Sequence, residues 1–134
     1  MRYLLDTDIC VYMARRKPVR LMARLDQVWP GELAMSIVTY LELVFGGMKS
    51  RQPEAALTRV EQIRDLVPLA PLTADVAREY GRIRIELEKK GLPIGPFDLL
   101  IAAHALSLGL TLVTANVREF ARVPGLRVEN WANG

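Results

Sequence analysis

Short apolar runs alternate with longer segments of helical periodicity along this chain of 134 residues. The runs are bounded by polar or turn-forming residues, as is typical of short strands. The predicted strands cover residues 2–5, 33–37, 67–70, 110–114 and 126–129. Strands that alternate with helices predict an α/β fold, here a three-layer α/β/α sandwich on a mostly parallel sheet of four to five strands.

Helical spacing of apolar residues marks most of the segments between these strands. The predicted helices cover residues from about 6 to 17, 21 to 28, 38 to 45, 53 to 67, 73 to 90, 96 to 108, and 117 to 121. Thr7 or Asp8 is the expected N-terminal cap of the first helix. Gly46-Gly47 is expected to stop the helix that begins at Val38, and Gly109 to stop the one that ends at Leu108.

Three carboxylates lie within or beside apolar runs that otherwise resemble core. Asp6 closes the 3–5 run, Glu42 lies inside the 40–45 run, and Asp98 opens the 99–103 run. Burying ionised carboxylates without a positive partner is costly, and no Lys or Arg lies within these runs. Ligands of parallel α/β sheets bind beyond the carboxyl ends of the strands, where all three could converge. The pattern therefore predicts one shared metal pocket.

Each candidate also has a simpler structural interpretation. Asp6 and Asp8 could cap a helix, and Asp98 could favour a helix dipole. Thr114 ends a predicted strand, where its hydroxyl could hold a metal-bound water or a phosphate oxygen, or serve only as a β-branched strand residue. His104 is the single histidine. Its spacing from Asp98 places the two on different helix faces, so we expect a structural or surface histidine.

Composition indicates one ordinary globular domain spanning residues 1–134, with 51% hydrophobic and 25% charged residues. The net charge of +3 and pI near 9.3 suit a polyanionic substrate. Basic positions from Arg15 to Arg24 and from Lys49 to Arg51 could guide phosphates or form a solvated face. A single cysteine and no apolar stretch long enough to cross a bilayer predict a cytoplasmic protein.

Three stretches of the chain resemble the PIN-domain ribonucleases, and within them the VapC-like toxins of toxin-antitoxin pairs. They are residues 3–8, residues 39–43, and residues 94–105 followed by 112–114. Their order and spacing match across essentially the whole domain. The resemblance implies a homodimeric endoribonuclease that depends on Mg²⁺ or Mn²⁺ and cuts tRNA, rRNA or mRNA to stop translation.

The resemblance also implies site residues and a protein partner. Its acidic metal ligands correspond to Asp6, Glu42 and Asp98. A cognate antitoxin would hold the enzyme inactive. We expect an apolar antitoxin segment to lie against the helices near Met13, Met22 and Phe45 and to send a basic side chain toward the acids.

One position departs from the family pattern. Many PIN domains carry a fourth acid directly after the strand that ends at Thr114, whereas this chain has Ala115-Asn116. Asn116 could act as a neutral oxygen ligand, or Glu119 could supply the acid from the next turn. These alternatives leave the second metal position open.

Two other functions fit parts of the sequence. Leu4 to Asp8 after a strand, with Thr114 after a later one, also resembles a phosphohydrolase of the haloacid-dehalogenase type. That family needs a well-placed lysine and a later acidic pair, and the tail offers only Glu119 and Glu129. The third alternative is a non-catalytic binding domain whose acids merely cap helices.

Overall fold

The computed structural model describes residues 1–133, and within them the strands form one parallel sheet in the order β3-β2-β1-β4-β5. Central strand β1 pairs Tyr3 with Leu33 on one side and with Thr111 on the other. The strands are β1 (Tyr3–Leu5), β2 (Leu33–Ser36), β3 (Leu69–Ala70), β4 (Thr111–Val113) and β5 (Val128–Glu129). The predicted α/β class and five-stranded parallel sheet are confirmed.

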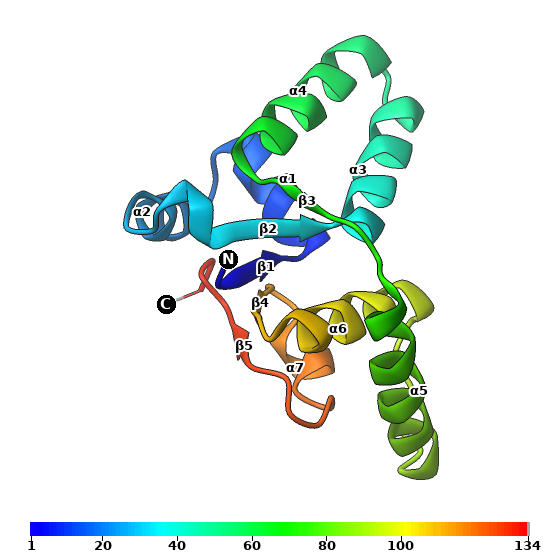
Figure 1. Ribbon diagram of the computed structural model, residues 1–134. Coiled ribbons are helices and arrows are strands. Elements are labelled where there is room, and N and C mark those ends of the chain that lie inside the picture. Colours follow the sequence, from blue (N-terminus) through cyan, green and yellow to red (C-terminus); the bar gives the residue numbers. More distant parts are fainter. Residues whose placement is uncertain (134) are drawn as a thin grey trace.

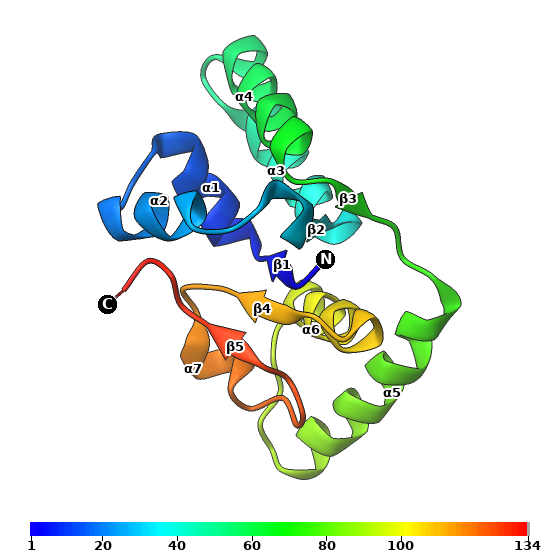
Figure 2. The ribbon, with the colours of Figure 1, turned by 60° about the vertical axis from the view of Figure 1, so that its left-hand side comes forward.

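Helices cover both faces of the sheet (Figures 1 and 2). Helices α1, α2 and α4 lie on one face, while α5, α6 and α7 lie on the other. The helices are α1 (Thr7–Arg15), α2 (Val19–Asp26), α3 (Ile37–Lys49), α4 (Pro53–Leu66), α5 (Ala74–Lys89), α6 (Pro96–Leu108) and α7 (Val117–Phe120), with a 3₁₀ turn at Pro30–Glu32. No helix in residues 1–133 is long and apolar enough to span a membrane. The predicted three-layer sandwich is confirmed.

Two apolar clusters, one on each face of the sheet, form the core. Leu4 packs with residues of α5 and α6, whereas Tyr3 and Leu5 pack with residues of α1, α2 and α4. All three side chains of β1 are buried, because successive strand residues point to opposite faces and both faces are covered. Buried strands of this kind hold the polar residues that follow them in fixed positions.

Helix α3 is longer than the sequence predicted. It continues through Gly46 and Gly47 to Lys49, so the expected stop at these glycines is wrong. Gly47 is buried, and a Cβ atom there would lie 2.9 Å from Cδ2 of Leu57 on α4. The glycine therefore serves close packing of two helices rather than termination.

The caps of α1 and α6 show one error and one success. Asp6, and neither Thr7 nor Asp8, is the N-cap of α1, and its Oδ1 accepts the Thr7 N–H at 2.8 Å. The expected stop of α6 is confirmed, since Gly109 follows its last turn with φ of 66°.

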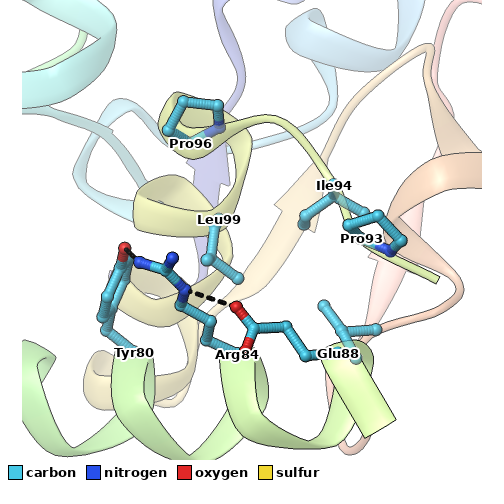
Figure 3. Close-up of a pocket in the computed structure, with 8 residues that line it drawn as sticks. Tyr80, Arg84, Glu88, Pro93, Ile94, Pro96 and Leu99 are labelled. Carbon is cyan, nitrogen blue, oxygen red and sulfur yellow. Dashed lines mark hydrogen bonds and ion pairs between the residues drawn. The ribbon is translucent and has the colours of Figure 1, made fainter. Parts of the chain in front are cut away.

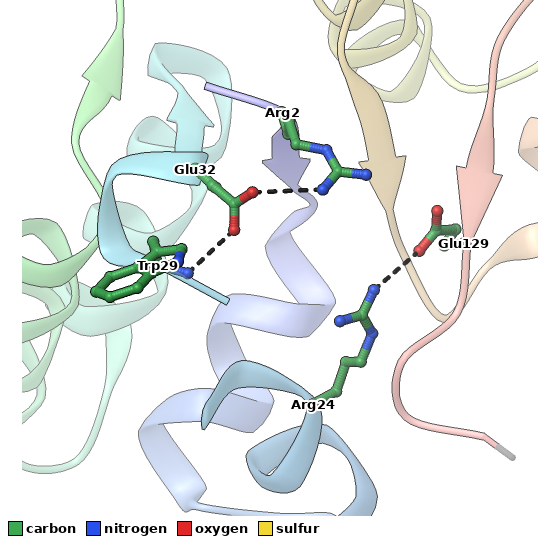
Figure 4. Close-up of polar contacts among 5 residues, drawn as sticks. All are labelled: Arg2, Arg24, Trp29, Glu32 and Glu129. Atoms are coloured by element: carbon green, nitrogen blue, oxygen red, sulfur yellow. Dashed lines mark hydrogen bonds and ion pairs between the residues drawn. The ribbon is translucent and has the colours of Figure 1, made fainter. Parts of the chain in front are cut away.

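Arg24, on α2, contacts Glu129 of strand β5 (Figure 4) and Trp131 shortly after it. Its guanidinium lies 4.7 Å from the ring centre of Trp131 and 3.9 Å from a carboxylate oxygen of Glu129. Trp131 in turn contacts Tyr3 edge-on, with ring centres 4.8 Å apart. Nearby, Arg2 pairs with Glu32, as Figure 4 also shows. Arg24 therefore has contacts within the protein, and its proposed role in guiding phosphates stays a prediction.

Candidate active site

The acids singled out in the sequence lie at the edge of the sheet where the parallel strands end. Asp6 follows β1 directly, Glu42 lies in the second turn of α3 just after β2, and Asp98 lies in the first turn of α6. The charges of Asp6 and Glu42 both act on the pKa of Asp98. The structure thus brings the three predicted residues to one place.

Asp6 is the most buried of these acids, with 5% of its surface exposed. Its Oδ2 accepts the Thr114 hydroxyl at 2.7 Å, and its Oδ1 accepts the Thr7 N–H. Burial raises the pKa of Asp6 to about 6, the charge of Asp8 adds to the rise, and the two hydrogen bonds oppose it. The side chain is therefore fixed in orientation but costly to ionise.

Glu42 is half-buried and held by the hydroxyl of Thr7, which donates to its Oε1 at 2.8 Å. The apolar run around it is only partly core, because Leu43 is buried whereas Leu41 is 57% and Phe45 is 66% exposed. The expectation that Glu42 lies inside a buried run is therefore correct for one side of the helix only. Its site is the rim of the pocket, with apolar side chains facing solvent beside it.

Asp98 and Glu119 form the other side of the site. Burial raises the pKa of Asp98 to about 7, followed by the charge of Glu119 and a hydrogen bond with it. Glu119, on α7, accepts the Gly95 N–H at 3.2 Å and a hydrogen bond from the Asn116 amide. Asn116 and Glu119 are the two alternatives for the fourth ligand. Glu119 lies against Asp98, and the Asn116 amide donates a hydrogen bond to Glu119.

Asp8 belongs to the same group, although the sequence suggested only a capping role for it. Its Oδ2 accepts the Ala115 N–H at 3.0 Å, and its Oδ1 is buried without a hydrogen-bond partner in residues 1–133. Burial also raises the pKa of Asp8. The signal is topological: only the pairing of β1 with β4 brings Asp8 beside Ala115.

Thr114, directly after β4, is hydrogen-bonded to Asp6. Its side chain is fully buried, and its hydroxyl donates to Asp6 and accepts the Asn116 N–H at 3.0 Å. This hydroxyl is hydrogen-bonded within the protein and orients Asp6. The expectation that it holds a metal-bound water or a phosphate oxygen stays a prediction.

His104 lies apart from the site, in the core. Its Nδ1 is 2.8 Å from the hydroxyl of Ser36, and the ring is 1% exposed. Burial lowers its pKa, with an opposing effect from the carbonyl of Pro71. The expectation of a structural histidine is confirmed.

These acids are named here the acid cluster: Asp6, Asp8, Glu42, Asp98 and Glu119. None of them forms an ion pair within residues 1–133. Their oxygens are the ligands that hard cations such as Mg²⁺ and Mn²⁺ prefer, and the unpartnered Oδ1 of Asp8 and the raised pKa values favour a cation. As arranged, no three acidic, histidine or cysteine side chains in the described chain are set to hold an ion together, so binding requires side-chain rotation.

The fold and site agree with the comparison to known families. Residues 3–126 match the PIN domain, which defines the class of protein. The chain is 41% identical over 132 residues to the tRNA(fMet)-specific endonuclease VapC of Shigella flexneri, covering 98% of this chain and 99% of the relative. It is 40% identical over 131 residues to ribonuclease VapC2 of Haemophilus influenzae, covering 98% of each. The chain therefore belongs to the VapC ribonucleases of the PIN-domain family.

Solved structures give the same result. VapBC of Salmonella typhimurium bound to DNA superposes with a TM-score of 0.92 at 38% identity, covering 98% of both chains. VapBC-5 of Mycobacterium tuberculosis, a member of the VapBC family of toxin-antitoxin systems, superposes with a TM-score of 0.73 at 27% identity, covering 96% of both. The resemblance drawn from the motifs is confirmed, and the haloacid-dehalogenase alternative is set aside.

Proposed function

We propose that this protein is an endoribonuclease that uses Mg²⁺ or Mn²⁺ at the acid cluster and acts as the toxin of a toxin-antitoxin pair. The observation that carries the proposal is the meeting of several carboxylates, without an ion pair in residues 1–133, at the carboxyl edge of a PIN-domain sheet. Such a group is stable at neutral pH when a cation offsets the repulsion.

Asp6, Glu42 and Asp98 would hold the ion, with Glu119 and Asp8 as further oxygen donors. When bound, the ion supplies Lewis-acid stabilisation of negative charge on the phosphoryl oxygens. Hydroxyl groups already orient Asp6 and Glu42, and rotation of carboxylate side chains would complete the ligand set. Because the pKa of Asp98 is raised to about 7, protonated and ionised forms coexist at neutral pH, and any proton on this carboxyl group would leave when the carboxylate becomes a ligand.

RNA is the proposed substrate, and a tRNA is the first to test because the Shigella relative is named for tRNA(fMet). Exposed basic residues at Arg15, Arg16 and Lys17 lie at the end of α1, and Arg15 lines a groove that also contains Glu42. Neutralising these three together should weaken RNA binding and flatten its salt dependence. An unchanged salt slope would make them solvated surface only.

The decisive test is RNA cleavage by purified protein freed of any antitoxin. We expect tRNA to be cut in the presence of Mg²⁺ or Mn²⁺, and cutting to stop in EDTA. Asp98→Asn should reduce the rate by more than about a hundredfold. Asp65→Asn, an exposed carboxylate on α4, is the matched control and should cut normally. Cleavage in EDTA, or full activity of Asp98→Asn, would refute the proposal.

We further propose that an antitoxin occupies the groove between α1, α3 and α4. This groove has a volume of about 600 Å³, and its lining includes Glu42, Val11 and Leu43. A smaller cavity of about 230 Å³, lined in part by Met13 and Met22, continues across α1. A segment there would bring a basic side chain within reach of Glu42, which would combine steric blockage with charge pairing.

Ala14 lines both cavities, which makes it a specific probe of this surface. Ala14→Glu should weaken inhibition by the cognate antitoxin, measured as the antitoxin concentration that halves RNA cleavage. Ala77→Glu on the exposed face of α5 is the control. Equal inhibition of both variants would exclude the groove. The homodimer stays a prediction, to be checked by light scattering.

A further inference from the structure

A further cavity, named here the second cavity, lies near the acid cluster. Figure 3 shows residues that line it. Its volume is about 240 Å³, and it lies between α5 and the segment that leads into α6. Pro96 and Leu99, on either side of Asp98 in the sequence, line it. Pro96 also lines a cavity of about 210 Å³ that contains Glu42 and Asp98. The two cavities are therefore neighbours, with Pro96 between them.

The second cavity has an apolar floor and a polar rim. Leu87 and Leu99 are 2% and 5% exposed, and Ile94 and two prolines complete the apolar lining. Tyr80, Arg84 and Glu88 form the rim, as Figure 3 shows. An apolar floor with a few polar groups at the rim is the usual lining of a small-ligand site.

Arg84 is held in place by its neighbours on α5. Its Nη1 donates to the Tyr80 hydroxyl at 2.8 Å, and its Nε donates to Glu88 at 2.9 Å (Figure 3). The Arg84 and Glu88 side chains are 55% and 59% exposed, so their ion pair adds little to stability. The pair instead presents a fixed guanidinium and carboxylate side by side at the cavity mouth.

We infer that this cavity binds an unpaired nucleobase of the RNA beside the scissile phosphate, and that it prefers guanine. The inference rests on the proposed ribonuclease function. Proteins bind unstacked bases of single-stranded RNA by contact with their faces and hydrogen bonds to their edges. Here the buried side chains of Leu87 and Leu99 would contact the face of the base, and Arg84 and Glu88 would meet its edge. A base in this cavity would belong to a nucleotide whose phosphate lies near Asp98, since Pro96 separates the two sites.

The preference for guanine follows from the rim chemistry. Arg84 offers only hydrogen-bond donors and Glu88 only acceptors. The Watson–Crick edge of guanine carries the O6 acceptor next to the N1–H and N2–H donors, which matches this pair. Adenine would turn the lone pair of N1 toward the carboxylate, and an unmatched polar contact of this kind is strongly rejected.

The test is cleavage of RNAs that differ only in the nucleotides flanking the cut. We expect wild-type protein to favour guanine at one flanking position by at least about tenfold. Arg84→Ala and Glu88→Gln should each reduce the preference, because each removes one of the two groups that match the O6 acceptor and the N1–H and N2–H donors of guanine. Arg82→Ala is the matched control, since Arg82 pairs with Glu79 on the same helix outside the cavity. Unchanged selectivity in Arg84→Ala and Glu88→Gln would overturn the inference.

A binding measurement separates this inference from the proposed function. Nucleoside monophosphates in EDTA can be compared by ligand-detected NMR, and guanosine 5′-monophosphate should bind to wild-type protein and not to Arg84→Ala. If RNA is cut without base preference, the cavity inference fails and the proposed function stands. If no RNA is cut but guanosine binding depends on Arg84, the proposed function fails together with the placement of the base beside a scissile phosphate, and only guanine binding in the cavity stands. A changed oligomer mass in Arg84→Ala, with base selectivity intact, would assign the cavity to a second copy and overturn the inference.

Discussion

The carboxylates of the acid cluster and those on the outer helix faces differ in their partners. On α5, Glu79 lies 2.6 Å from Arg82, and Glu88 lies 2.9 Å from Arg84. In the cluster, by contrast, Asp6 is bound by a hydroxyl and a backbone N–H, and Asp98 faces Glu119. These α5 acids are paired with arginines, whereas the cluster acids accept hydrogen bonds but have no cationic partner in residues 1–133.

This difference separates acids that serve solubility from acids that serve binding. Net charge does not distinguish the two kinds of acid, but Asp6, Glu42 and Asp98 each lie within or beside an apolar run. Raised pKa values for Asp6 and Asp98 show that the folded state disfavours their ionised forms. The repulsion that disfavours these ionised carboxylates would be relieved by a bound cation, so the same electrostatics favour cation binding.

The largest expected effect, after loss of Asp98, is at Glu119. Glu119→Gln should lower RNA cleavage by more than about tenfold and raise the Mg²⁺ concentration needed for half-maximal rate, because a charge beside Asp98 is removed. Glu86→Gln, an outer carboxylate 3.9 Å from Lys90, is the control and should behave as wild type. Identical Mg²⁺ titrations for wild type and Glu119→Gln would exclude Glu119 from the site.

The next effect is at the hydroxyl that orients Asp6. Thr114→Val keeps the shape of the buried side chain and removes its hydrogen bond to Asp6. Loss of such a supporting contact should reduce activity by about 10- to 100-fold and weaken Mg²⁺ affinity. Thr114→Ser restores the hydroxyl and should recover most of the activity. If Val and Ser behave alike, the role of Thr114 is packing alone.

The sequence was sufficient for most of the fold because its strands and helices rest on local periodicity. The buried face of α5 follows from residues spaced along one helix, α6 follows from the proline and glycine that bound its apolar run, and the parallel order follows from alternating elements. Prediction from the sequence failed where the role of a residue depends on a contact with a residue distant in the chain. Gly47 continues a helix because Leu57 packs on it, and the contacts of Arg24 with Tyr3 and Trp131 are not apparent from local periodicity.

The candidate site shows the same division. Asp6, Glu42 and Asp98 could be selected because each interrupts an apolar run. Asp8 could not, since its contact with Ala115 depends on the pairing of two strands from opposite ends of the chain. The choice between Asn116 and Glu119 likewise needed the Gly95 N–H, which only the folded loop brings to Glu119.

A third prediction concerns stability without metal. Asp6 and Asp98 have folded-state pKa values of about 6 and about 7, above the ordinary 3.8, so the folded protein holds protons that the unfolded chain releases. In EDTA the destabilising contribution of these acids is full above pH 7 and decreases as pH falls through 7 and 6. The melting temperature of wild type relative to Asp98→Asn should therefore be lowest at pH 8 and should recover at pH 6.

Added Mg²⁺ should reverse this trend, with stabilisation of wild type greater at pH 8 than at pH 6, because protons compete for the same oxygens. His104 acts in the opposite direction, since its lowered pKa favours the neutral form and costs stability as pH falls below about 6.5. Comparison with Asp98→Asn cancels that contribution. If the difference in melting temperature between wild type and Asp98→Asn did not change with pH, ionisation of Asp98 would not destabilise the folded protein.

The smallest expected effect is on the outer face, at the ion pair between Glu79 and Arg82. Their side chains are 31% and 47% exposed, so water screens the pair and ordering two long side chains offsets much of the attraction. A double-mutant cycle of Glu79→Gln and Arg82→Gln, measured by urea unfolding in EDTA, should give a coupling energy of about 0.5 kcal/mol or less. The slope with urea should not change. A coupling above about 1.5 kcal/mol would show that outer acids also carry substantial electrostatic energy. The statement that outer carboxylates contribute little electrostatic energy would then be wrong, and this outcome would not depend on how the acid cluster binds metal.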